Sequence, residues 1–167
     1  MTPENIPPPQ IRFSKTATIY KSEKSICIET LSGTAGLTYR EDEPYRVYLE
    51  PEATDEVLGQ ALLSALDRSR YIEDDEFYEP GRARRLYVDW QTEFTRRNGY
   101  KSRREFFKNV DWCMTKIREG NIVIQPHGRD KPGAWRGLPP EKTVVIPETR
   151  DAVAAGSALR LALDRCE

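Results

Sequence analysis

Two stretches near the start of the chain alternate apolar and polar side chains, the pattern of a strand with one buried face. They are TATIYKS at residues 16–22 and SICIET at residues 25–30. Because so few residues separate them, we expect a hairpin with its turn near residues 22–24. Residues 31–51 are rich in turn-forming side chains and contain one further candidate strand, YRVYL at 45–49.

The spacing of apolar residues then becomes helical. Thr54 is the expected N-cap of a first helix that ends near Arg70, and acidic residues in its first turn suit the positive end of the helix dipole. Its apolar face comprises Val57, Leu58, Ala61, Leu62, Ala65 and Leu66. A second helix is expected at about 83–97 and should end at Asn98-Gly99, which tolerate a left-handed cap. Its apolar stripe comprises Leu86, Trp90 and Phe94.

The second half of the chain adds a short helix, a hairpin, a strand and a last helix. Ser102 can cap a helix that runs to about residue 110. Residues 111–126, DWCMTKIREGNIVIQP, have the pattern of two strands joined at REGN, and TVVIP at 143–147 has that of a third. Thr149 is the expected cap of the last helix. The buried stripe of that helix comprises Ala155, Ala158, Leu159 and Ala162.

The order of these elements predicts the fold class. Helices alternate with groups of strands, so we expect an α/β domain with a mixed, mostly antiparallel sheet of about five or six strands, covered by about four helices. No linker is long enough to demand a second domain, so the domain is expected to occupy residues 13–167. Residues 1–12 are rich in proline and are expected to form a flexible, extended arm.

Composition adds the expectation of a cytoplasmic protein. The 167 residues are 38% hydrophobic and 32% charged, and no window approaches the 18 apolar residues of a membrane span. The N-terminus has neither the basic region nor the apolar region of a secretory signal. The three cysteines, Cys27, Cys113 and Cys166, are far apart in sequence and odd in number, which favours reduced thiols over a disulfide framework.

Charge is divided unevenly along the chain. Residues 1–79 contain 16 acidic and 8 basic side chains, whereas residues 80–136 contain 6 acidic and 14 basic ones. Such a division can mark a charged partner, or it can reflect complementary charged faces of one fold. The net charge of -1 for the whole chain hides this division, and the sequence alone slightly favours the second explanation, in which the charges pair internally or are solvated.

Candidates for catalysis are few. His127, the only histidine, lies in QPHGRDKPG, and we expect it in a solvent-exposed loop rather than as the base of a catalytic pair, since no GxSxG elbow accompanies it. A metal site is not expected, because the sequence contains neither CxxC nor HExxH. SGTAG at 32–36 lacks the lysine of a phosphate-binding loop and is interpreted as a turn. We therefore predict no cofactor and no enzymatic activity.

A run of carboxylates is the first candidate for recognition. Glu73, Asp74, Asp75, Glu76 and Glu79 could hold a hard cation, but their contiguous order lacks the pattern of a calcium loop. They could equally form a solvated loop, or they could bind a cationic protein, because concentrated acidic charge speeds association with one.

The basic segment at 82–108 is the second candidate. It interleaves arginine and lysine with aromatic rings, as proteins that bind single-stranded nucleic acids do. However, Trp90 and Phe94 belong to the apolar stripe, which favours a place in the core, and the sequence pI near 6.0 is low for a nucleic-acid-binding protein. A nucleic-acid-binding regulator or a small enzyme that uses this segment remains the alternative hypothesis.

An ordered set of segments resembles the CdiI-type immunity proteins of contact-dependent growth-inhibition systems. In the second half these are GYKSRREFFKNV (99–110), DWCMTKIREGNIVIQP (111–126), GAWRGL (133–138) and AAGSALRLALDRC (154–166). SKTATIYKS (14–22) and LGQALLSALDRSR (58–70) stand where that family has an opening strand and a helix ending in Ser-Arg. The likeness covers nearly the whole chain beyond the N-terminal arm.

The resemblance implies a cytoplasmic protein that binds the C-terminal toxin domain of its cognate CdiA, as a heterodimer, and blocks it. Many such toxins are nucleases, whose substrate grooves are basic, so an acidic surface would complement them. The family supplies no catalytic residues to carry over, and its toxin-contacting residues vary between systems. Our candidate toxin-binding residues are Tyr71, Glu73, Asp74, Asp75, Glu76 and Tyr78, with Glu41, Asp42 and Glu43 as a second set.

Overall fold

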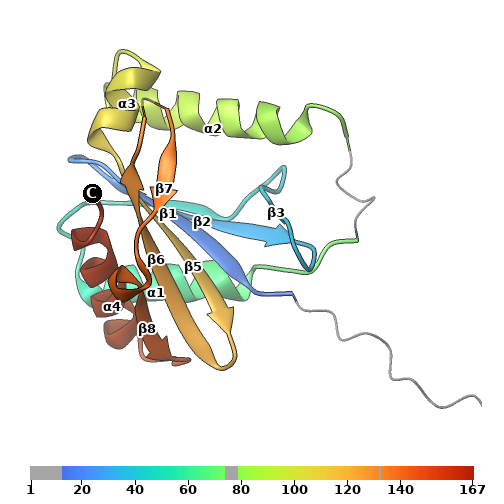
Figure 1. Cartoon of the computed structure of the whole chain (residues 1–167), viewed down its shortest axis with the longest axis vertical. Helices are drawn as coiled ribbons and strands as arrows, with labels where there is room; N and C mark the ends of the chain where they lie inside the picture. The colour runs from blue at the N-terminus through green and yellow to red at the C-terminus, as the bar shows by residue number, and fades with distance from the viewer. Residues whose placement is uncertain (1–12, 74–78, 132) are drawn as a thin grey trace, which may run out of the picture.

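An antiparallel sheet runs through the middle of the molecule and carries helices on both faces (Figure 1). The computed structural model describes residues 13–73, 79–131 and 133–167, so the expected N-terminal arm lies outside it. The strands are β1 (Thr16–Lys21), β2 (Ile26–Gly33), β3 (Thr38–Tyr39), β4 (Arg46–Leu49), β5 (Asp111–Arg118), β6 (Asn121–Arg129), β7 (Trp135–Gly137) and β8 (Val144–Pro147). The helices are α1 (Asp55–Asp67), α2 (Arg82–Arg97), α3 (Arg103–Asn109) and α4 (Ala152–Asp164), with a 3-10 turn at Pro140–Lys142.

The sheet confirms the expected class and refines the strand count. Its central order is β2-β1-β5-β6, and both predicted hairpins are present. Each outer position is shared by two short strands: β4 and β3 follow each other along β2, and β8 and β7 follow each other along β6. Within the described ranges the result is eight strands in six positions, all paired antiparallel. The sequence did not reveal β3 and β7, because two or three residues are too few to show alternation.

The two faces of the sheet bury two separate cores. On one face, α1 and α4 pack on residues such as Ala17, Ile19 and Ile28. On the other, α2 and α3 cover an aromatic cluster in which Trp90 and Phe94 are buried, as the apolar stripe predicted. Neighbouring positions of one strand point to opposite faces, so Ile19 belongs to the first core and Tyr20 to the second.

Three of the four predicted helix caps are confirmed, although α1 ends at Asp67 rather than near Arg70. Thr54 and Ser102 cap α1 and α3 through side-chain oxygens, and Asn98-Gly99 ends α2 with Gly99 at φ 70°. The expected cap of α4 is wrong by two residues. Asp151 accepts from the first-turn amides, and Thr149 instead accepts from the backbone N–H of Asp151.

The exposure of one apolar residue and the end of one strand also differ from what the sequence predicted. Val57, placed on the apolar face of the first helix, is 40% exposed at its first turn. Strand β6 does not stop at Pro126 but continues to Arg129. Pro126 lies where the outer partner of β6 changes from β8 to β7, a position where a missing N–H does not interrupt either ladder.

Candidate functional site

Only part of the predicted acidic surface falls on described residues. Tyr71 is half-buried, bridges to Gly33 at the end of β2, and makes an edge contact with the ring of Phe13 at 6.1 Å. Glu73 is exposed. The other members of the set, Asp74, Asp75, Glu76 and Tyr78, lie outside the described residues.

The second acidic set is partly neutralised within the chain. Glu41 forms an ion pair with Arg70 at 2.7 Å, and Asp42 forms one with Arg82 at 3.0 Å. Glu43 is exposed. Because Arg70 immediately precedes Tyr71, the Glu41 pair places Glu41 close to the described start of the first set, although the two residues are about thirty positions apart in sequence.

A buried charge network that sequence reasoning missed fixes α2 against the sheet. The Glu29 carboxylate on β2 is fully buried and contacts the Nε atoms of Arg40 at 2.9 Å and of Arg46 at 2.6 Å. Arg46 also reaches Glu93 on α2 at 3.0 Å, and the Arg40 guanidinium lies over the Trp90 ring at 4.8 Å. The loop before β4 and helix α2 are therefore held together by electrostatics as well as by packing.

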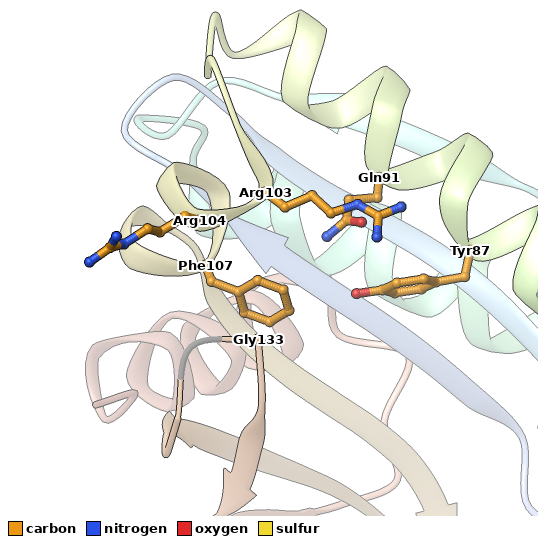
Figure 2. Close-up of a pocket in the computed structure, with 6 residues that line it drawn as sticks. All are labelled: Tyr87, Gln91, Arg103, Arg104, Phe107 and Gly133. Atoms are coloured by element: carbon orange, nitrogen blue, oxygen red, sulfur yellow. The ribbon is translucent and has the colours of Figure 1, made fainter.

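A pocket of about 560 Å³ opens between α2, α3 and the turn that precedes β7 (Figure 2). It is lined by Tyr87, Gln91, Arg103, Arg104, Phe107 and Gly133. Figure 2 shows Tyr87, Gln91, Arg103 and Phe107 converging on one space, while Arg104 points away from Gln91. Burial raises the pKa of Tyr87, with Arg40 and Arg103 opposing the shift, so its phenol stays neutral and can donate a hydrogen bond.

Gln91 is the unusual member of this pocket. Its side chain is only 2% exposed, yet neither Nε2 nor Oε1 has a hydrogen-bond partner among the described residues. Buried amides are nearly always paired, because losing water without gaining a partner costs about 1–3 kcal/mol. An unpaired amide beside a cavity marks a position where a ligand can supply the missing partners.

Gln91→Met should therefore make the isolated protein more stable. Methionine fills a similar volume and brings no unpaired polar atoms, so we expect the free energy of unfolding to rise by about 1–3 kcal/mol. Urea denaturation measures the change. Gln60→Met, at an exposed position of α1, is the control and should stay within about 0.5 kcal/mol of the parent protein. A loss of stability in Gln91→Met would mean that the amide is satisfied in solution.

The basic segment is partly used for internal contacts. Arg82 is buried in its pair with Asp42, Arg85 contacts Glu79 at 3.5 Å, and the Arg97 guanidinium lies over the Tyr48 ring at 3.8 Å. The exposed remainder comprises Arg84, Arg96, Lys101, Arg103, Arg104 and Lys108. The segment thus serves as a scaffold with a basic outer surface. Its Trp90 and Phe94 are buried and are not available to stack on nucleic-acid bases.

His127 is not in an exposed loop, and that prediction is wrong. It belongs to β6, is buried, and stacks on Trp112 with ring centroids 3.8 Å apart. Burial lowers the pKa of His127, against the effect of backbone hydrogen bonds, so the ring is neutral near pH 7. Pro126 and the glycines around it suggested a loop, but the strand pairing with β7 decided the conformation.

All three cysteines are free thiols, and two of them meet. The Cys113 and Cys166 sulfur atoms lie 3.6 Å apart, a proximity that their separation in sequence did not suggest. Burial raises the pKa of Cys27 to about 12. Among the described residues, no group of three or more His, Cys, Asp or Glu side chains is arranged to hold a metal ion. Over the same ranges, no helix is both long and apolar enough to cross a bilayer.

Comparison with known proteins gives consistent matches along nearly the whole chain. Immunity protein CdiI-YPIII of Yersinia pseudotuberculosis serotype O:3 (strain YPIII) is 27% identical over 175 residues, covering 92% of this chain and 96% of that protein. A chain in the structure of the CdiA-CT/CdiI toxin and immunity complex from Yersinia pseudotuberculosis superposes with a TM-score of 0.85 at 25% identity, covering 94% of this chain and 99% of that one.

A second solved structure has the same fold. It is the protein of unknown function NMB0488 from Neisseria meningitidis, with a TM-score of 0.83 at 27% identity, covering 94% of this chain and 98% of that chain. The family model CdiI, CDI immunity protein, matches residues 15–166, which is the described domain almost from end to end. The chain therefore belongs to the CdiI family of CDI immunity proteins.

Proposed function

We propose that this chain binds the C-terminal toxin domain of its cognate CdiA and neutralises it, protecting the cell that makes both proteins. Its similarity to a chain of a CdiA-CT/CdiI toxin and immunity complex, with a TM-score of 0.85 over 94% of the chain, carries the proposal. Family membership over residues 15–166 supports it. Neutralisation by binding needs a complementary surface and no catalytic group, so we expect a cytoplasmic one-to-one complex without enzymatic activity of its own.

Co-expression tests the proposal directly. The toxin domain of the cognate CdiA is produced alone or together with this chain in a sensitive host. We expect the toxin alone to stop growth, the pair to restore it, and the two proteins to co-purify through a tag on the toxin. Absence of both rescue and co-purification would refute the proposal. Salt-dependent binding of RNA or DNA by this chain alone would instead favour the nucleic-acid hypothesis.

The acidic residues beside Tyr71 are our proposal for part of the contact surface, and a nuclease is our proposal for the toxin. A basic substrate groove would be matched by the exposed Glu73 and the carboxylates that follow it in sequence. Glu41 and Asp42 contribute less free charge, because Arg70 and Arg82 already pair with them.

Charge reversal tests this surface. Changing Asp74, Asp75 and Glu76 together to lysine should weaken toxin binding at least tenfold, mainly through slower association at low salt. Surface plasmon resonance at two salt concentrations measures the association rate. The matched control changes the exposed Glu50, Glu52 and Glu148 to lysine, which alters net charge equally. Equal effects of the two triple variants would refute a local surface and leave only general electrostatic attraction.

A further inference from the structure

We infer that the pocket between α2 and α3 receives an acidic side chain of the toxin domain, whose carboxylate contacts Arg103 while its peptide group pairs with Gln91. This inference rests on the proposed function and adds a specific contact to it. It also assigns a role to part of the basic segment, which the acidic surface proposed above leaves unused.

The unpaired amide of Gln91 carries the argument. Nε2 needs an acceptor and Oε1 needs a donor. The described residues supply neither, although Gln91 is only 2% exposed. An acidic residue within a polypeptide brings both, since its backbone C=O can accept from Nε2 and its backbone N–H can donate to Oε1 while its carboxylate stays free for Arg103. A simple carboxylate ion such as acetate could satisfy only Nε2. The amide therefore favours an acidic residue within a polypeptide over a small free anion.

Arg103 provides the charge for this contact. It is exposed and has no acidic partner in the described part of the chain, and its side chain lies beside Gln91 at the pocket (Figure 2). A guanidinium can bind a carboxylate with two parallel hydrogen bonds, which are stronger than those between neutral groups. Tyr87 and Phe107 line the same space with aromatic surface, so part of the wall around this contact is apolar.

The surroundings of the pocket favour an anion as well. A smaller cavity of about 240 Å³ adjoins it around Phe107 and is lined by Arg104, Lys108, Arg129 and Lys131, with Asp130 as the one acid of its lining. Arg129 is already paired with Asp111 at 3.1 Å, which leaves the other cations to attract a partner. The pocket between α2 and α3, at about 560 Å³, has room for one side chain together with part of its backbone.

The test compares single variants of this chain in binding to the intact toxin domain, measured by isothermal titration calorimetry. Arg103→Ala should weaken binding about tenfold or more, because a charged hydrogen bond is lost. Arg104→Ala, which removes the same charge one residue away, should weaken it no more than about threefold, because that side chain points away from Gln91. Gln91→Met should also weaken binding while leaving the isolated protein folded.

The partner residue is found by changing each surface Asp and Glu of the toxin domain to Asn or Gln. The correct substitution should weaken binding of the parent protein tenfold but have little further effect on Arg103→Ala, as a double-mutant cycle requires. A parent protein that fails to bind the toxin would refute the proposed function and the inference together. Parent binding with no loss in Arg103→Ala, or with equal loss in Arg104→Ala, would overturn the inference alone.

Two further measurements exclude other occupants. The isolated chain is titrated with inorganic phosphate and with sodium acetate, and the Gln91 side-chain amide is followed by nitrogen-15 NMR. A single-stranded RNA oligonucleotide is titrated in the same way. We expect no saturable binding of any of the three. Saturable binding that disappears in Arg103→Ala, together with unchanged toxin affinity in that variant, would assign the pocket to a free anion or to RNA and overturn the inference.

Discussion

Glu29→Gln is expected to lower the free energy of unfolding by about 3 kcal/mol, because it removes the negative charge at the centre of a buried network. The carboxylate is fully buried, and it faces Arg40 and Arg46, whose side chains are only 14% and 17% exposed. Glutamine fits the same space but leaves two guanidinium groups beside a neutral amide. Removing one partner of a buried ion pair costs about 3–5 kcal/mol, and the remaining contact of Arg46 with Glu93 offsets part of that.

Urea denaturation and thermal unfolding of the parent protein and of Glu29→Gln measure this loss of stability. For a chain of this size, 3 kcal/mol corresponds to a decrease in Tm on the order of 10 °C. Glu93→Gln is the matched control, because it makes the same chemical change in the same network at a side chain that is 37% exposed. We expect less than about 1 kcal/mol there. A similar, small effect in both variants would show that water replaces the buried contact and would contradict the prediction.

The periodic parts of the chain were predictable because their pattern follows from local geometry. Helix α1 and the hairpin of β5 and β6 have long apolar repeats, and polar side chains at Thr54 and Ser102 satisfy the first backbone amides of two helices. The turn between β5 and β6 places Glu119 at φ 49° and Gly120 at φ 73°, as a tight hairpin requires. These features depend on residues close together in sequence.

The features that were missed depend on contacts between distant residues. His127 is surrounded by turn-forming residues, but stacking on Trp112 and pairing with β7 place it inside the protein. Glu29 looks like the polar member of an alternating strand, and only Arg40 and Arg46 explain why it is buried. Tertiary contacts override local preference in both cases.

The candidate site shows the same division between local and distant information. The acidic run near Tyr71 is visible in the sequence, and its role in binding remains a prediction. By contrast, no sequence pattern could indicate that Gln91 lacks partners, because a glutamine in a helix is ordinarily solvated. One signal of burial was available: Tyr87 and Phe94 lie four residues before and three residues after Gln91, on the same side of the helix.

Gly59→Ala and Gly156→Ala are each expected to destabilise the protein by about 2 kcal/mol or more. Helices α1 and α4 cross at these glycines, and the contact is reciprocal: a methyl group at Gly59 would overlap the carbonyl oxygen of Ala152, and one at Gly156 would overlap that of Asp55. The obstructing atoms are backbone, so a whole helix must move to relieve the overlap. Alanine improves helix propensity by about 1 kcal/mol, but overpacking of a closely fitted core costs about 1–3 kcal/mol and sometimes more.

Gly36→Ala provides the control, because its added methyl group would meet no atom within 4 Å and its stability should change by less than about 0.5 kcal/mol. The double variant Gly59→Ala and Gly156→Ala should lose less than the sum of the single losses, since one separation of the helices relieves both overlaps. Helices α1 and α4 cover the face of the sheet opposite α2 and α3 (Figure 1). Variants that still fold should therefore bind the toxin with nearly parental affinity. An increase in stability from either single change would contradict the prediction, because it would show that the two helices do not meet at these glycines in solution.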